Sequence, residues 1–216
     1  MRARLTVPRE EEQPTVVVID DDRDVRDALQ SLLRSVGLRV ELFASVQEFL
    51  DGPGPARPGC LVLDVRLPGR SGLDFHDDLV KANVQLPVLF ISGHADVPMS
   101  VRAMKAGALE FLTKPIRHQD LLDAVQQAIG QDRARCDYER VVAALRANFD
   151  KLTPRERDVM ALVVSGRPNK QIAADIAISE ATVKLHRGQV MRKMQAQSLA
   201  ELVSMADKLG SSRPKS

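Results

Sequence analysis

Five short apolar runs alternate with helix-like segments over the first 130 residues, and no other feature constrains the fold as strongly. The runs cover residues 15–20, 38–44, 60–64, 86–92 and 108–112. Between them, apolar residues recur at the spacing of an amphipathic helix. Such an alternation favours a parallel sheet with helices on both faces, and strands buried on both faces are nearly continuous apolar runs. We therefore predict an α/β domain built on a five-stranded, doubly wound parallel sheet.

The last third of the chain contains no strand-like run and predicts a different kind of domain. Thr153, Pro154 and Glu156 mark the start of a helix, with a capping box and a proline at the first helical position. Three more helical segments follow, at residues 169–177, 180–194 and 198–210. The predicted parts of the chain are an α/β domain, a polar helical linker and an all-α four-helix domain, at residues 14–130, 131–149 and 150–211.

The two predicted domains carry opposite net charges. Residues 1–130 contain 15 Lys or Arg and 19 Asp or Glu, a net charge of −4, whereas residues 150–216 contain 12 and 7, a net charge of +5. This asymmetry indicates that the two domains have different partners. No apolar run approaches the roughly 20 residues that span a bilayer, and the N-terminus has no signal-peptide core. We therefore expect a cytoplasmic protein with no membrane partner.

The predicted strands end in residues that suit phosphoryl chemistry. Functional groups gather at the carboxyl ends of the strands in open parallel sheets, and those expected at that edge here are Asp20, Asp21, Asp22, Asp64, Ser92 and Lys114. Carboxylates this close repel one another unless a cation lies among them, and Mg²⁺ prefers oxygen ligands. A carboxylate beside Mg²⁺ can act as a nucleophile and form an aspartyl phosphate. The hydroxyl and the ammonium would then hold the phosphoryl oxygens.

The sequences VIDDD, LVLDVRLPG and FISGHADVPMSVRAMKAGALEFLTKP together resemble the receiver domain of two-component response regulators of the FixJ type, over about residues 14–130. The resemblance implies a flavodoxin-like (CheY-like) fold with Asp64 as the phosphoacceptor. It implies Mg²⁺ as the cofactor, with Mn²⁺ as an alternative. The implied ligands are three carboxylates and one backbone carbonyl, from Asp20, Asp21, Asp64 and Arg66. Ser92 and Lys114 are implied to contact the phosphoryl group and Phe111 to be the switch aromatic, and the Lys114–Pro115 bond is implied to be cis.

Residues 169–194 have the pattern of a helix-turn-helix, whose second helix enters the major groove of DNA. On that helix, Val183, Val190 and Met194 recur at intervals of seven and four residues and should face the core. A small helical bundle with a solvated charged face is the alternative interpretation of the composition. The whole stretch LTPRERDVMALVVSGRPNKQIAADIAISEATVKLHRGQVMRKM is similar to the LuxR/NarL-type DNA-binding domain, with the recognition helix at about residues 180–193.

The candidate DNA contacts lie at the start of the first of these helices and on exposed sides of the second: Lys170, Gln171, Thr182, Lys184, Leu185, Arg187, Gln189 and Arg192. The resemblance assigns base reading to Lys184 and Leu185. The sequence departs from the family at Gly188, where a long polar side chain is common, and Gln189 or Arg187 would substitute there. The final helix resembles the dimer contact of the family, through Leu199, Leu202, Val203 and Ala206.

Together these interpretations predict a response regulator that is a transcription factor and not an enzyme, beyond phosphoryl uptake and slow self-dephosphorylation. A sensor histidine kinase would phosphorylate Asp64. Homodimerisation on phosphorylation, through the surface of residues 97–107, 108–112 and 118–129, would promote binding to a double-stranded DNA operator. The dimer would regulate transcription by RNA polymerase, as an activator in most of this family.

Three other functions are consistent with parts of the pattern. A phosphatase of the dehalogenase-like class also uses an aspartate nucleophile and Mg²⁺, but it needs a second aspartate where this chain has Arg66. A phosphorylation-independent DNA-binding regulator would use its receiver to sense a protein or a ligand, and the complete set of polar strand-end residues argues against it. A receiver that works through RNA or protein contacts would lack salt-dependent, sequence-specific binding to duplex DNA.

Overall fold

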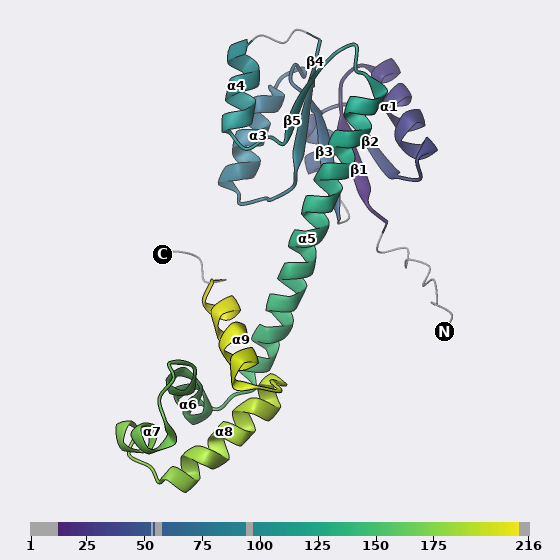
Figure 1. Ribbon diagram of the computed structural model, residues 1–216. Helices are drawn as coiled ribbons and strands as arrows, with labels where there is room; N and C mark the ends of the chain where they lie inside the picture. The colour runs from purple at the N-terminus through teal and green to yellow at the C-terminus, as the bar shows by residue number, and fades with distance from the viewer. Residues whose placement is uncertain (1–12, 53, 55–57, 94–96, 212–216) are drawn as a thin grey trace, which may run out of the picture. The chain divides into compact units, whose positions relative to one another are not determined.

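The computed structural model describes residues 13–52, 54, 58–93 and 97–211. The chain divides into two compact units, Met1–Cys136 and Asp137–Ser216. The first unit contains a sheet with helices around it, and the second is helical (Figure 1). Within the described ranges, no helix combines the length and the apolar character needed to cross a membrane.

The first unit is built on a parallel sheet in the strand order β2-β1-β3-β4-β5. The strands are β1 (Thr15–Ile19), β2 (Arg39–Phe43), β3 (Gly59–Asp64), β4 (Val88–Ser92) and β5 (Glu110–Thr113). Every neighbouring pair is parallel, which confirms the predicted five-stranded sheet. β3 lies at the centre, between β1 and β4 (Figure 1).

β4 and β5 begin two residues later than the sequence predicted. Pro87 has no N–H group to donate to a neighbouring strand, and β4 starts at the next residue. Before β5, Gly107 adopts a φ of 95° and turns the chain after α4 (Val97–Lys105). That turn leaves Ala108 and Leu109 outside the strand.

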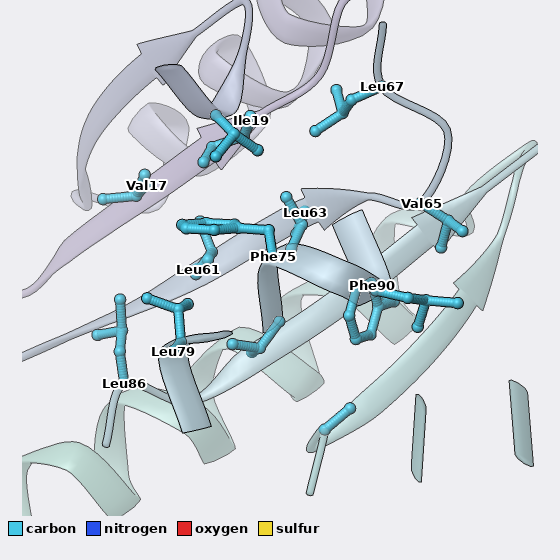
Figure 2. Close-up of a cluster of buried hydrophobic side chains, with 14 of the residues drawn as sticks. Val17, Ile19, Leu61, Leu63, Val65, Leu67, Phe75, Leu79, Leu86 and Phe90 are labelled. Carbon is cyan, nitrogen blue, oxygen red and sulfur yellow. The ribbon is translucent and has the colours of Figure 1, made fainter. Parts of the chain in front are cut away.

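Alternate side chains of β1 point into two separate cores. Val17 and Ile19 belong to a cluster with residues of α2 (Val46–Leu50), α3 (Gly72–Lys81) and α4, part of which is drawn in Figure 2. Val16 and Val18 belong to a second cluster with residues of α1 (Arg23–Ser35) and α5 (His118–Asp150). Helices therefore cover both faces of the sheet, which explains why its inner strands are apolar almost to their carboxyl ends.

Helix α5 is one continuous helix of 33 residues. The sequence predicted a helix that ends at Ile129, followed by a separate helical linker. Gly130 does not break the helix, because an exposed glycine in a helix costs only about 1 kcal/mol relative to alanine. Half of the 20 residues that follow it are Gln, Arg, Ala or Glu, which favour helix, so the helix continues to Asp150.

The second unit packs four further helices around one core. They are α6 (Pro154–Val164), α7 (Asn169–Asp175), α8 (Glu180–Met194) and α9 (Leu199–Ser211). The predicted capping box is present, because the Thr153 side chain accepts the Glu156 N–H and the Glu156 side chain accepts the Thr153 N–H. The three residues of α8 that were predicted to face the core are buried, namely Val183, Val190 and Met194.

Candidate functional site

The strand order brings polar residues from distant parts of the chain to one edge of the sheet. Asp20 follows β1, Asp64 ends β3, Ser92 ends β4, and Lys114 follows β5. These four strands are consecutive neighbours in the sheet. The strand order therefore confirms the prediction that the carboxyl ends of these four strands lie side by side.

A single ammonium group joins two buried carboxylates at this edge. The Lys114 Nζ lies 2.6 Å from Asp20 Oδ2 and 2.9 Å from Asp64 Oδ1. The side chain of Asp20 is fully buried and that of Asp64 is 6% exposed, while Lys114 keeps 22% of its side chain exposed. Buried charges need such partners because desolvation is costly.

The pKa values of this cluster follow from burial and charge. Burial raises the pKa of Asp64 above its ordinary value, and the hydrogen bond from Lys114 opposes that rise. For Lys114, burial acts to lower the pKa of the ammonium, but its hydrogen bonds to Asp20 and Asp64 outweigh burial and raise it. Lys114 is therefore held in its charged form, as a fixed positive charge beside Asp64.

Backbone groups fix the orientation of both carboxylates. The Arg66 N–H donates to Asp64 Oδ2 at 2.6 Å, and the Asp22 N–H donates to Asp20 Oδ1 at 2.9 Å. The Arg26 side chain, from the first turn of α1, donates to the Asp20 carbonyl at 2.6 Å. Sequence reasoning did not single out Arg26. Its position six residues after Asp20, one turn into the helix, is the signal that points to it.

The acidic residues suit a hard divalent cation, which prefers carboxylate and water oxygens. Asp20 and Asp64 both direct an oxygen at one cation, the Lys114 ammonium, so their geometry fits a shared positive charge. Asp21 is exposed. In the described part of the chain, no group of three or more His, Cys, Asp or Glu side chains is arranged to hold a metal ion. Of the three carboxylates predicted to hold the cation, those of Asp20 and Asp64 converge on one point.

Two other predicted residues lie on the two strands beyond β3, one on β4 and one on β5. Ser92 is buried, and its carbonyl accepts the Lys114 N–H at 2.8 Å. Phe111 is half-buried on β5, with its ring centroid 6.3 Å from that of Phe90. The Lys114–Pro115 bond is cis, as the resemblance implied. The roles of Ser92 and Phe111 in a switch stay predictions.

In the second unit, α7 and α8 form the predicted helix–turn–helix segment. Most of the candidate DNA contacts are exposed on it: Lys170, Gln171, Lys184, Leu185 and Arg192. The other three are half-buried: Thr182, Arg187 and Gln189. Leu185 is 62% exposed. Gly188 is exposed, with open space around it.

Four of the candidate DNA contacts already make side-chain hydrogen bonds within the second unit. The Thr182 hydroxyl lies 2.7 Å from the Ser179 hydroxyl oxygen. The Arg187 guanidinium donates to Asn169 Oδ1 at 2.9 Å and so ties α8 to the start of α7. The Arg192 guanidinium donates to Gln189 Oε1 at 2.5 Å on the surface of α8. Arg187 therefore has a structural contact, whereas the structure of the described residues shows none for the Lys184 side chain.

The predicted dimer contact on α9 needs a correction. Leu202 is fully buried and belongs to the core of its own unit, so its side chain is not available to a partner. Ala206 is half-buried against the same core. Leu199 is 40% exposed and Val203 is half-buried. The apolar spacing on α9 reflects packing within the unit, because one stripe of a short helix can satisfy its own core.

Comparison with known proteins assigns each of the two units to a known family. The family described as response regulator receiver domain matches residues 16–126, and the family of bacterial regulatory proteins, luxR family, matches residues 150–206. Nodulation protein W of Bradyrhizobium diazoefficiens is 52% identical over 195 residues, an alignment that covers 90% of this chain and 86% of the relative. The transcriptional regulatory protein FixJ of the same organism is 42% identical over 195 residues, with 90% and 95% covered.

A solved structure of the response regulator StyR has a TM-score of 0.82 and 45% sequence identity, and it covers 91% of this chain and 99% of that one. A solved structure of full-length FixJ from B. japonicum has a TM-score of 0.56 and 41% identity, with 94% and 100% covered. The chain therefore belongs to the two-component response regulators and is a transcription regulator with a receiver domain followed by a luxR-family DNA-binding domain.

Proposed function

We propose that phosphorylation of Asp64 by a sensor histidine kinase switches this transcription regulator. The observation that carries the proposal is the Lys114 ammonium, which lies within hydrogen-bond distance of both Asp20 and Asp64. A fixed positive charge beside a buried strand-end carboxylate stabilises the added negative charge of a phosphoryl group. In this proposal the receiver spans residues 14–130, the linker 131–149 and the DNA-binding domain 150–211.

In the proposed reaction, an Asp64 oxygen attacks the phosphorus of the kinase phosphohistidine. The phosphorus–nitrogen bond breaks, and its electron pair stays on the histidine. Bound Mg²⁺, or Mn²⁺, would neutralise phosphoryl charge, with Asp20, Asp21, Asp64 and the Arg66 carbonyl as its protein ligands. Lys114 and the Ser92 hydroxyl then donate hydrogen bonds to phosphoryl oxygens, and Phe111 adjusts to the new position of Ser92.

Two new contacts to the phosphoryl group would contribute roughly 1.5–3 kcal/mol each. Almost complete switching needs about 5.5 kcal/mol. The two contacts together approach this figure but need not reach it, and we assign the remainder to dimerisation through α4, β5 and the first turns of α5. A dimer presents two DNA-binding domains to an operator with two half-sites, which raises their effective concentration. The operator-bound dimer would then act on RNA polymerase, as an activator.

Phosphoryl uptake tests the first half of the proposal. The protein is incubated with Mg²⁺ and acetyl phosphate and separated on a phosphate-retarding gel, beside Asp64→Asn and the control Asp120→Asn. We expect a retarded band in the wild type and in the control, because Asp120 is an exposed carboxylate on α5 that pairs with Arg117 and is not one of the buried strand-end residues. No retarded band in the folded wild type would overturn the proposal. It would favour a DNA-binding regulator whose receiver senses a protein or a ligand.

Duplex binding tests the second half. A duplex selected by the wild-type protein from a random-sequence pool is titrated at several salt concentrations. Lys184→Ala should weaken binding about tenfold and reduce the slope of log affinity against log salt by about 0.9, because one cation–phosphate or cation–base contact is lost. Lys208→Ala, which removes an exposed lysine of α9, should leave the slope unchanged. Equal slopes for both variants would exclude α8 as the recognition helix.

A further inference from the structure

We propose that Asp132 fastens α5 to the strand that ends in Asp64, and that this contact is needed to transmit phosphorylation to the DNA-binding domain. Asp132 is thus assigned as a positioning residue: it acts through the helix that it holds. The second part of this inference rests on the proposed phosphorylation of Asp64, whereas the first part stands on geometry alone.

The contact joins α5 directly to the start of β3. Asp132 is fully buried, and its Oδ2 accepts the Gly59 N–H at 2.9 Å, across 73 positions of sequence. Gly59 is the first residue of β3 and Asp64 is the last. Asp132 therefore holds the amino end of the strand whose carboxyl end bears the proposed phosphoacceptor.

Two neighbours on α5 complete the environment of the carboxylate. The Arg135 guanidinium forms an ion pair with Asp132 Oδ1, and the Cys136 Sγ lies 3.8 Å from Asp132 Oδ2. A carboxylate with no exposed surface is stable only when it is paired and hydrogen-bonded, as it is here. Burial, and secondly the charge of Asp132, raise the pKa of the Cys60 thiol to about 12. Cys60 is the second residue of β3, so the charge of Asp132 acts on this strand.

The position of the contact suits an anchor. The first compact unit ends at Cys136, within one turn of Asp132. Each of the next four residues is exposed, from Asp137 to Arg140. Asp132 and its α5 partners thus make the last buried polar contact before the boundary of the unit. They also lie beyond residue 126, where the match to the receiver family ends, so the anchor is not part of the general receiver pattern.

An anchored helix can transmit a change in the receiver, because the turns of α5 around Asp132 then follow the movement of β3. Without the anchor, the turns after Ile129 have less to hold them, because Cys136 is the one other buried α5 residue between 130 and 140. Coupling between two sites is a free-energy difference, and packed, hydrogen-bonded elements between the sites carry it. Removing the anchor should therefore lower coupling without altering chemistry at Asp64.

The anchor itself is tested in the full chain without phosphorylation. Asp132→Ala should raise the exchange rate of the Gly59 amide at least tenfold and accelerate tryptic cleavage at Arg133 and Arg140. Asp132→Asn retains an oxygen for the Gly59 N–H and should show a smaller increase. Asp137→Ala is the matched control, because Asp137 is exposed on the same helix and forms an exposed ion pair with Arg140. Unchanged Gly59 exchange in Asp132→Ala would overturn the anchor.

Coupling is tested on the same variants with acetyl phosphate, Mg²⁺ and the selected duplex. We expect phosphoryl uptake within twofold of wild type, and a ratio of phosphorylated to unphosphorylated duplex affinity that falls at least fivefold in Asp132→Ala. The ratio should be intermediate in Asp132→Asn and unchanged in Asp137→Ala. An unchanged ratio in Asp132→Ala would overturn the coupling role. If the wild type itself takes up no phosphoryl group, the proposed function fails, and Gly59 exchange still decides the anchor.

Discussion

The two compact units place their functional side chains in opposite environments. In the receiver, Asp20 and Asp64 are buried, and backbone N–H groups and one ammonium fix their orientation. In the DNA-binding unit, Lys184 and Leu185 are exposed and open to a partner. Chemistry on a small group benefits from charges held in a partly desolvated place, whereas recognition of a large polyanion requires side chains that reach into solvent. The first site is therefore identified from buried side chains that converge on one another, and the second from side chains that are exposed to solvent.

The largest effect should come from α9, where burial and exposure alternate on one helix. Leu202→Ala removes a fully buried side chain and should lower the free energy of unfolding of the second unit by about 3 kcal/mol. Leu199→Ala changes a side chain that is 40% exposed and should cost less than about 1 kcal/mol. Urea denaturation followed by circular dichroism measures both. Equal losses in the free energy of unfolding for the two variants would mean that Leu202 is a surface residue and available to a partner.

The next effect concerns the buried cluster of the receiver. Lys114→Met leaves two carboxylates without their common cation, and the free energy of unfolding at neutral pH should fall by about 3 kcal/mol. Lys81→Met breaks an ion pair with Asp78 in which the lysine side chain is 76% exposed, and should change it by no more than about 0.5 kcal/mol. Chemical denaturation of the full chain is the measurement. A cost for Lys114→Met as small as that for Lys81→Met would mean that the cluster is solvated.

Acidification should change the stability contributions of two carboxyl groups in opposite directions, those of Glu156 in the second unit and Asp64 in the first. A hydrogen bond from Lys193 lowers the pKa of Glu156, so its contribution to stability is present above its ordinary pKa and is lost as pH falls through the lower value. Burial raises the pKa of Asp64, so protonation of Asp64 adds stability as pH falls through that higher value.

The pH dependence is measured by comparing variants with wild type from pH 7 to pH 3. Glu156→Gln should be less stable than wild type at pH 7, by less than about 1 kcal/mol, and the gap should close at low pH. Asp64→Asn should be more stable than wild type at pH 7, with that gap also closing at low pH. Gaps that stay constant with pH would show that neither charge matters.

The smallest effect should come from Gly188→Ala, and Gly72→Ala provides the contrast of a crowded glycine. A Cβ at Gly188 would meet nothing within 4 Å, so Gly188→Ala should stabilise α8 by up to about 1 kcal/mol. A Cβ at Gly72 would lie 2.2 Å from the Asp64 carbonyl oxygen, so Gly72→Ala should be destabilising. Thermal unfolding of both variants compares the crowded site with the open one. Destabilisation by Gly188→Ala would mean that α8 needs flexibility at this position.

Local sequence patterns were sufficient for the elements and for the identity of most site residues. Apolar runs with polar ends predicted the sheet and placed Asp20, Asp64, Ser92 and Lys114 at one edge, because strand periodicity and strand ends are properties of short segments. The helix-turn-helix segment and the buried face of α8 followed from spacing in the same way. The cis bond before Pro115 came from resemblance to a family, and the structure agrees.

Tertiary structure alone decided which of these residues make contact. The ion pair of Lys114 with Asp20 spans 94 positions and depends on the order of the strands. The burial of Leu202 and of Asp132 depends on what packs against each helix, and the contact of Arg26 depends on how α1 follows β1. Periodicity defines which side of a helix is apolar, but only the packed neighbours determine whether that side meets its own core, a partner or solvent.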